Sequence, residues 1–201
     1  PMVNKFLIFL IGFILAGAHY SSYSAFIKAV QEGNVNKVKT LVATANAAAY
    51  DNEAIRFASA NGDVEIARIL LASPIVDPGA RNNQAMILAI ENGHTEIIRL
   101  LLAHPKVNPS IRGQRAVFLA TELNQADIVK LFINDGRVQP VLEPYVLSYQ
   151  LKKAAEFENV DLLRFLLSYS YYNRIGHLVF KNGDLRSIKT MVAAGYRIDQ
   201  E

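Results

Sequence analysis

Side chains that could carry out metal or nucleophilic chemistry are few in this chain and are poorly spaced for it. The 201-residue sequence has no cysteine, which excludes thiolate zinc sites, cysteine nucleophiles and disulfide scaffolds. A metal-binding pair on a helix needs two histidines four residues apart. None of the four histidines is spaced in this way from another: His19, His94, His104 and His177.

Carboxylates and glycines form no catalytic pattern either. Glu156 and Glu158 are two residues apart, and residues two apart on a helix do not face each other. The sequence contains no glycine-rich phosphate loop and no Gly-x-Ser-x-Gly elbow. We therefore expect no catalytic residue, metal, cofactor or small-molecule substrate, and we do not expect an enzyme.

The composition indicates a globular protein without a strongly charged partner. Apolar residues make up 51% of the chain, which suffices for a buried core. The net charge is +3, from 21 basic and 18 acidic residues that are interspersed. Because a nucleic-acid binder concentrates its basic residues in a stripe beside a recognition motif, we expect no nucleic-acid partner.

Residues 2–18 form a separate apolar segment, in which residues 6–18 carry no polar side chain. This run is shorter than the ~20 residues of a membrane-spanning helix and has the length of a signal-peptide core. Since Ala16-Gly17-Ala18 supplies the small residues that a signal peptidase requires, we expect cleavage after Ala18 and a secreted or exported protein. The alternative is an uncleaved helix that caps the first repeat, joins two copies as a homodimer, or attaches the protein to a membrane.

An internal repeat runs through the second predicted domain, residues 22–201. A glycine or asparagine marks it at a spacing of 31 residues, at Gly62, Gly93 and Asn124. Gly33 fits upstream at a spacing of 29, and irregularly spaced copies near Asn159 and Gly183 bring the number of units to about six.

Each unit predicts two helices. Alanines four residues apart share one helix face, so they let the first helix pack closely on its neighbours. These pairs are Ala25/Ala29, Ala54/Ala58, Ala85/Ala89 and Ala116/Ala120. The glycine or asparagine ends this helix because both tolerate the left-handed conformation. Asp63, Thr95 and Asp127 suit the start of the second helix, which carries an apolar stripe.

A loop with a central hydrophobic residue follows each second helix. Prolines bracket this residue in the first two loops, 74–78 and 105–109, and the third loop, 136–140, keeps only the second proline. Proline cannot continue a helix, so these segments are extended connections. We expect the central valines to anchor the loops to the helices: Val76, Val107 and Val138.

This unit of helix, turn, helix and extended loop resembles the ankyrin repeat, over nearly all of residues 22–198 and most clearly at 58–71, 89–102 and 120–133. The resemblance implies an all-α solenoid of about six helix-turn-helix repeats, in which His94 is structural. The period is shorter than the family's ~33 residues. The family's Thr-Pro-Leu-His opening is absent, so its threonine–histidine hydrogen bonds must be replaced or missing, and we do not expect a long hairpin finger.

The resemblance also implies a protein partner on the concave face of the first helices and loop tips. The register places these candidate residues there: Phe57, Asn61, Leu88, Glu91, Asn92, Arg112, Arg115, Leu119, Glu122 and Leu123. Glu91 and Glu122 form either a solvated surface or an acidic strip for a basic partner. Similar repeats occur in proteins of intracellular bacteria, amoebae and giant viruses, which implies a secreted effector acting on a host, including in the host cytoplasm.

Two sets of residues admit alternatives. Phe57, Leu88 and Leu119, at equal spacing, form either an exposed apolar strip or contacts between repeats. The tyrosines of the C-terminal third are either interface residues or fillers where the repeat loses its register, and we favour the second interpretation. They are Tyr145, Tyr149, Tyr169, Tyr171 and Tyr172.

Overall fold

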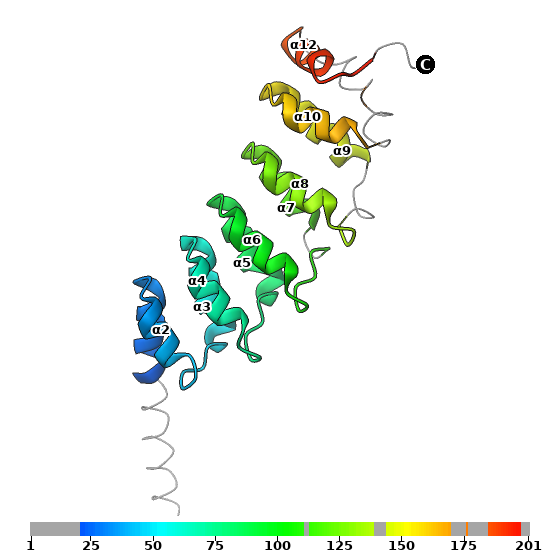
Figure 1. Ribbon diagram of the computed structural model, residues 1–201. Helices are drawn as coiled ribbons and strands as arrows, with labels where there is room; N and C mark the ends of the chain where they lie inside the picture. Colours follow the sequence, from blue (N-terminus) through cyan, green and yellow to red (C-terminus); the bar gives the residue numbers. More distant parts are fainter. Residues whose placement is uncertain (1–20, 111–112, 139–143, 170–175, 177–184, 198–201) are drawn as a thin grey trace, which may run out of the picture. The chain divides into compact units, whose positions relative to one another are not determined.

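The computed structural model describes residues 21–110, 113–138, 144–169, 176 and 185–197 (Figure 1). The predicted signal or association segment, residues 2–18, lies outside the described residues. The chain divides into two compact units, which we call the N-terminal unit (residues 1–107) and the C-terminal unit (residues 108–201). Each unit is described by itself below.

The N-terminal unit is a series of helix pairs. The helical segment 21–31 precedes α2 (Val35–Leu41), and the pairs α3 (Ala49–Asn61) with α4 (Val64–Leu71) and α5 (Ala80–Glu91) with α6 (Thr95–Ala103) follow. The first helices α3 and α5 contact each other, and α4 lies between α2 and α6. Each pair therefore covers the apolar side of the next.

The C-terminal unit repeats this arrangement with α7 (Gly113–Glu122), α8 (Ala126–Asn134), α9 (Pro144–Glu156), α10 (Val160–Leu167) and α12 (Leu185–Ala193). The first helix α7 contacts α9, and α10 contacts both α8 and α12. No strand occurs in the described parts of either unit. The predicted all-α fold, built from helix-turn-helix repeats, is confirmed.

The core follows the predicted pattern of alanines and second-helix hydrophobics. Both alanines are buried in the pairs that belong to α3, α5 and α7, whereas Ala25 of the segment 21–31 is partly exposed. Residues without a large side chain at these positions allow the first helices to approach closely. The largest side chains that are fully buried come mainly from the second helices, such as Leu70, Leu101 and Phe132.

The first helices end in a left-handed residue, as predicted. The φ angle is 67° at Gly33, 77° at Gly62, 73° at Gly93 and 53° at Asn124. In the fifth repeat the same conformation occurs at Glu158, with a φ of 54°, and the side chain of Glu158 pairs with Arg186. This repeat is therefore offset by 34 residues from Asn124, which explains its irregular spacing in the sequence.

The residues predicted for the starts of the second helices lie there. Asp63 is the residue before α4, but its side chain makes no capping hydrogen bond, and Thr95 and Asp127 lie inside the first turns of α6 and α8. Asparagine side chains cap α2 and α10 instead, because Asn34 accepts from the Lys37 N–H and Asn159 from the Leu162 N–H.

The loops are anchored by their valines, as predicted: Val76, Val107 and Val138 are buried. Side chains tie neighbouring loops together in each unit. In the N-terminal unit, the Lys106 Nζ donates to the carbonyls of Pro74 and Val76, at 2.6 and 3.0 Å.

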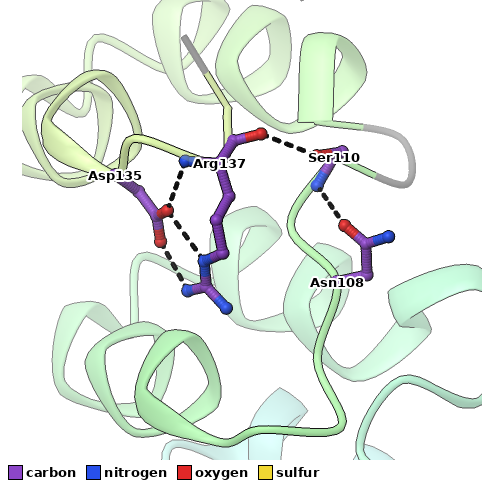
Figure 2. Close-up of polar contacts among 4 residues, drawn as sticks. All are labelled: Asn108, Ser110, Asp135 and Arg137. Atoms are coloured by element: carbon purple, nitrogen blue, oxygen red, sulfur yellow. Dashed lines mark hydrogen bonds and ion pairs between the residues drawn. The ribbon is translucent and has the colours of Figure 1, made fainter. Parts of the chain in front are cut away.

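The C-terminal unit uses a different tie, shown in Figure 2. The Ser110 hydroxyl donates to the carbonyl of Arg137 at 2.6 Å, and the Ser110 N–H donates to Asn108 Oδ1. Arg137 donates from its backbone N–H, Nε and Nη2 to the carboxylate of Asp135. The hydrogen bonds from Arg137 hold the pKa of Asp135 below its usual value, and the side-chain bond contributes most.

Three consecutive left-handed residues form a tip inside the first turn of α3 and again inside the first turn of α5. They are Tyr50, Asp51 and Asn52, and, 31 residues later, Arg81, Asn82 and Asn83. For residues other than glycine this conformation costs about 1 kcal/mol or more each. Asn52 offsets part of the cost because its Oδ1 accepts the N–H of Asp77 at 2.7 Å, which joins the tip to the following loop. This hydrogen bond makes a link between repeats in a chain that lacks the Thr-Pro-Leu-His opening.

Candidate protein-interaction surface

The predicted partner-binding residues lie on or directly after first helices. Phe57 and Asn61 belong to α3, Leu88 and Glu91 to α5, and Asn92 follows α5. Arg115, Leu119 and Glu122 belong to α7, and Leu123 follows it. The remaining candidate, Arg112, lies outside the described residues. Asn61, Glu91, Asn92, Arg115, Glu122 and Leu123 are exposed, so the register identified the solvent-facing side of these helices.

Phe57, Leu88 and Leu119 fit in part both the interpretation as an exposed apolar strip and the interpretation as contacts between repeats. All three side chains are partly exposed and partly buried. They therefore contribute to packing between helices and still present some apolar surface. Phe57 and Leu88 belong to the N-terminal unit, and Leu119 belongs to the C-terminal unit.

The residue just before each left-handed helix end distinguishes the two units. In the N-terminal unit this position holds Glu32, Asn61 and Asn92, which are all exposed polar residues. In the C-terminal unit it holds Leu123 and Phe157, which are 44% and 42% exposed. The backbone geometry is the same, so the change lies in the side chains alone. Leu123 and Phe157, the helix-end pair, are thus apolar and exposed at a position that is polar in the N-terminal unit.

The two helix ends that carry this pair lie side by side. The Asn159 Nδ2 donates to Asn124 Oδ1 at 2.9 Å. Asn124 comes directly after Leu123, and Asn159 comes two residues after Phe157, so this hydrogen bond joins the two helix ends. Leu119 is four residues before Leu123, so it extends the apolar surface along the same face of α7. Exposed apolar residues that are contiguous, rather than scattered, are typical of interaction sites.

Lys153 links the helix-end pair to its surroundings. Its Nζ is 3.1 Å from the Glu156 carboxylate and 3.7 Å from that of Glu122, so it connects α9 with α7. The same ammonium is 5.9 Å from the ring centroids of Tyr149 and Phe157, one helical turn on either side. Both carboxylates raise the pKa of Lys153, and the hydrogen bond with Glu156 has the largest effect.

Tyr149 of α9 packs against α7. Its ring stacks on Phe118 of α7, with centroids 4.5 Å apart and an interplanar angle of 15°. Its hydroxyl donates to Glu122. It therefore fills space between α7 and α9, as predicted, and because it remains partly exposed it also belongs to the candidate surface. The signal that could have found it is its α9 stripe with Lys153 and Phe157, at spacings of four.

The other tyrosines have different surroundings. The Tyr169 hydroxyl donates to Asn134 Oδ1 at 2.7 Å, and its ring contacts Phe165 edge to face. This agrees with the predicted role in filling gaps between repeats. The side chains of Tyr145, Tyr171 and Tyr172 lie outside the described residues.

The equivalent surface of the N-terminal unit is polar. Arg81 of the second tip pairs with Asp51 of the first at 2.9 Å, and Tyr50 is 60% exposed beside them. Among the described residues, Glu91 has no ion-pair or hydrogen-bond partner, whereas its counterpart Glu122 bonds Tyr149 and Lys153. Glu91 therefore fits the alternative of a solvated surface, whereas Glu122 is paired within its own unit.

His94 has a structural environment, as predicted. Its Nε2 lies 3.1 Å from the carbonyl of Ala60, at the end of the preceding first helix. Its ring occupies the place where a Cβ on Gly62 would stand, at 2.7 Å. The described residues hold no cluster of three or more potential metal ligands. Within the same part of the chain, each helix is too short or too polar to cross a bilayer.

Comparison with known families agrees with this geometry. A family model described as ankyrin repeats, in three copies, matches residues 55–141. Neither the curated proteins nor the solved structures contain a significant match. The matched segment extends from α3 to the loop after α8, and helix pairs of the same form continue on both sides of it. The chain therefore contains ankyrin repeats over residues 55–141, and such repeats are protein–protein interaction modules.

Proposed function

We propose that this protein binds a partner protein through the first-helix face of its C-terminal unit. The observation that carries the proposal is the helix-end pair, Leu123 and Phe157, which is exposed at a position where the N-terminal unit has only polar residues. Leu119 and Tyr149 enlarge the apolar surface around the pair. Aromatic and large apolar side chains in such clusters supply most of the binding energy at protein interfaces.

The surroundings of the pair also suit an interface. Lys153 contacts the aromatic rings and the two carboxylates beside it, and such contacts restrict the side-chain freedom that a partner would have to remove on binding. Lys153 lies between Tyr149 and Phe157, and its two carboxylate partners lie beside the apolar residues. Protein interfaces commonly combine apolar and polar groups.

Affinity purification with matched variants tests the proposal. The bait is the full chain, and the variants are Leu123→Glu/Phe157→Glu in the C-terminal unit and Asn61→Glu/Asn92→Glu at the equivalent positions of the N-terminal unit. We expect one or more proteins that the wild type and the second variant retain and that the first variant loses by about tenfold or more.

Circular dichroism and thermal unfolding show whether both variants are folded. Equal retention by all three proteins, or equal loss in both variants, would contradict a site at the helix-end pair. Glu91→Arg and Glu122→Arg extend the test to the carboxylates. A loss with Glu91→Arg alone would move the site to the N-terminal unit.

The finer role as an exported effector rests on residues 2–18 and is part of the same proposal. It is supported by the apolar run 6–18, which has the length of a signal-peptide core and ends in small residues. Intact mass measurement of the mature protein from its source tests it, because cleavage after Ala18 removes a defined mass. Retention of the segment would favour the alternative, self-association or membrane attachment. Light scattering with and without residues 2–18 would then measure that association directly.

A further inference from the structure

The charges on the C-terminal face indicate what kind of partner it accepts, and this inference rests on the proposed function. The two carboxylates of the face are already neutralised within it. Glu122 accepts from the Tyr149 hydroxyl and lies 3.7 Å from Lys153, and Glu156 lies 3.1 Å from Lys153 and 3.8 Å from Lys152. Lys153 serves both carboxylates at once, so neither is available to attract a basic partner.

Two cations remain at the edge of the apolar surface. Arg115 is exposed and has no ion-pair partner among the described residues. The Lys152 side chain is 62% exposed, and within the described part of the chain its one ion pair is the 3.8 Å contact with Glu156. Together, α7 and α9 carry three basic residues and two acidic ones. The basic residues are Arg115, Lys152 and Lys153, and the acidic ones are Glu122 and Glu156. The face therefore carries a surplus positive charge.

The corresponding first helices of the N-terminal unit, α3 and α5, carry more acidic than basic residues. Along α3 and α5, three acidic residues face two basic ones: Asp51, Glu53 and Glu91 against Arg56 and Arg81. The carboxylate at the position equivalent to Glu122 is Glu91, which has no partner among the described residues. The helices α3 and α5 thus differ from α7 and α9 in the sign of their net charge as well as in the polarity of their helix ends.

The positions of the groups also set a distance. Arg115, Leu119 and Leu123 are four residues apart in succession, so they follow one stripe of α7. At a rise of ~1.5 Å per residue, about 12 Å separates the level of Arg115 from that of Leu123. A partner that meets both would carry an acidic and an apolar residue at about this separation, which an extended segment reaches in about four residues.

We propose that the C-terminal face binds an acidic protein segment with bulky apolar anchors. The anchors contact Leu119, Leu123 and Phe157, and the carboxylates of the segment pair with Arg115 and Lys152. Charge complementarity of this kind selects among apolar partners because a basic segment would be repelled.

Selection of peptides displayed on phage against the immobilised full chain tests this inference. Parallel selections use Leu123→Ser/Phe157→Ser to identify binders that need the helix-end pair. We expect those binders to share bulky apolar residues and a net negative charge. A synthetic peptide of the strongest sequence should lose about tenfold in affinity when its carboxylates are changed to amides.

The variant Arg115→Gln/Lys152→Gln should weaken the same peptide by a similar factor, and the amide version of the peptide should be insensitive to it. Higher salt should weaken only the acidic peptide. Binders that need the helix-end pair but are neutral or basic would overturn the inference and leave the proposed function intact. An absence of any binder that depends on the pair would instead overturn the proposed function.

Discussion

The two units of this protein share one backbone plan and present different surfaces. In both units, a first helix ends in a left-handed residue and the residue before it is exposed. The N-terminal unit fills that exposed position with glutamate and asparagine, and the C-terminal unit fills it with leucine and phenylalanine. Packing requirements therefore determine the residue type at the left-handed position and at its neighbours in the core. The exposed position is free to take on a binding role.

The largest expected effect is a loss of stability when an alanine replaces the left-handed residue at a helix end, and it should differ between the two units. Gly62→Ala places a Cβ 2.7 Å from the His94 ring at a φ of 77°, and we expect a loss of about 2–3 kcal/mol in the free energy of unfolding. Urea unfolding followed by circular dichroism measures it. The matched change in the C-terminal unit is Asn124→Ala. It starts from a residue that already has a Cβ, so we expect a loss of about 1 kcal/mol, mainly from the Asn159 hydrogen bond.

A second variant shows which part of the Gly62 effect is steric. His94→Ala removes the ring, so Gly62→Ala should cost less in that background, and the coupling should be at least about 1 kcal/mol. Equal costs of Gly62→Ala with and without the histidine ring would show that the left-handed backbone alone determines the effect.

The next effect concerns the tip of the N-terminal unit. Asn52→Ala removes the hydrogen bond to the Asp77 N–H and leaves a nonglycine residue at a φ of 61°, so we expect a loss of about 2 kcal/mol in the free energy of unfolding. Asn52→Gly loses the same hydrogen bond but adopts the conformation freely. We expect it to be more stable than Asn52→Ala by about 1 kcal/mol. The two urea midpoints measure this difference, and equal midpoints would mean that the tip leaves the left-handed conformation when the asparagine is lost.

A smaller effect tests the loop tie of the C-terminal unit. Ser110→Ala removes the donor to the Arg137 carbonyl, and we expect a loss of about 1 kcal/mol. Ser168→Ala is the control, because that hydroxyl bonds a carbonyl only three residues away and joins no second loop. Thermal unfolding of both variants distinguishes them. Similar values for the two serines would show that the tie between loops adds nothing beyond a local hydrogen bond.

The Asp135–Arg137 pair predicts a pH effect in the same unit. Arg137 lowers the pKa of Asp135 in the folded protein below its ordinary value of 3.8. The folded state therefore favours the ionised carboxylate, so this contribution is present above about pH 4 and is lost as the pH falls through the lower folded value. The urea midpoint of Asp135→Asn should thus change less between pH 7 and pH 3 than that of the wild type, by under about 1 kcal/mol. Parallel pH profiles of the two proteins would contradict the pairing.

The smallest expected effect on stability belongs to the helix-end pair itself. Leu123→Asn and Phe157→Asn copy the residues of the N-terminal unit onto the C-terminal unit. Because both side chains are substantially exposed, each change should alter the free energy of unfolding by about 0.5 kcal/mol or less. A loss of 2 kcal/mol or more in either variant would mean that the pair serves folding rather than binding.

The sequence sufficed for the features that depend on periodicity. The offset of 31 residues predicted the helix pairs, the buried alanines, the left-handed ends at Gly62, Gly93 and Asn124, and the valine anchors of the loops. It also placed six of the candidate surface residues on exposed positions. These features recur in each repeat because each repeat must pack against a similar neighbour.

Other features could not be predicted because local sequence signals do not encode them. Tyr50 and Arg81 have no preference for the left-handed conformation, so the tips could be recognised only from tertiary contacts. Glu158 ends its helix where glycine or asparagine was expected, and its 34-residue offset concealed the stripe of Tyr149, Lys153 and Phe157. The network around Lys153 depends on which side chains of α7 and α9 meet, and spacing alone does not determine that.

The contact between His94 and Gly62 has a consequence for how such a chain can diversify. Because the imidazole of His94 packs against a helix end that carries no Cβ, the two adjacent units constrain each other's sequence. Duplicating or shuffling a single unit would bring the imidazole against a side chain at some junctions. Moving two adjacent repeats together avoids this contact. The junctions of designed chimaeras should therefore be placed so that residues 62 and 94 come from the same parent sequence.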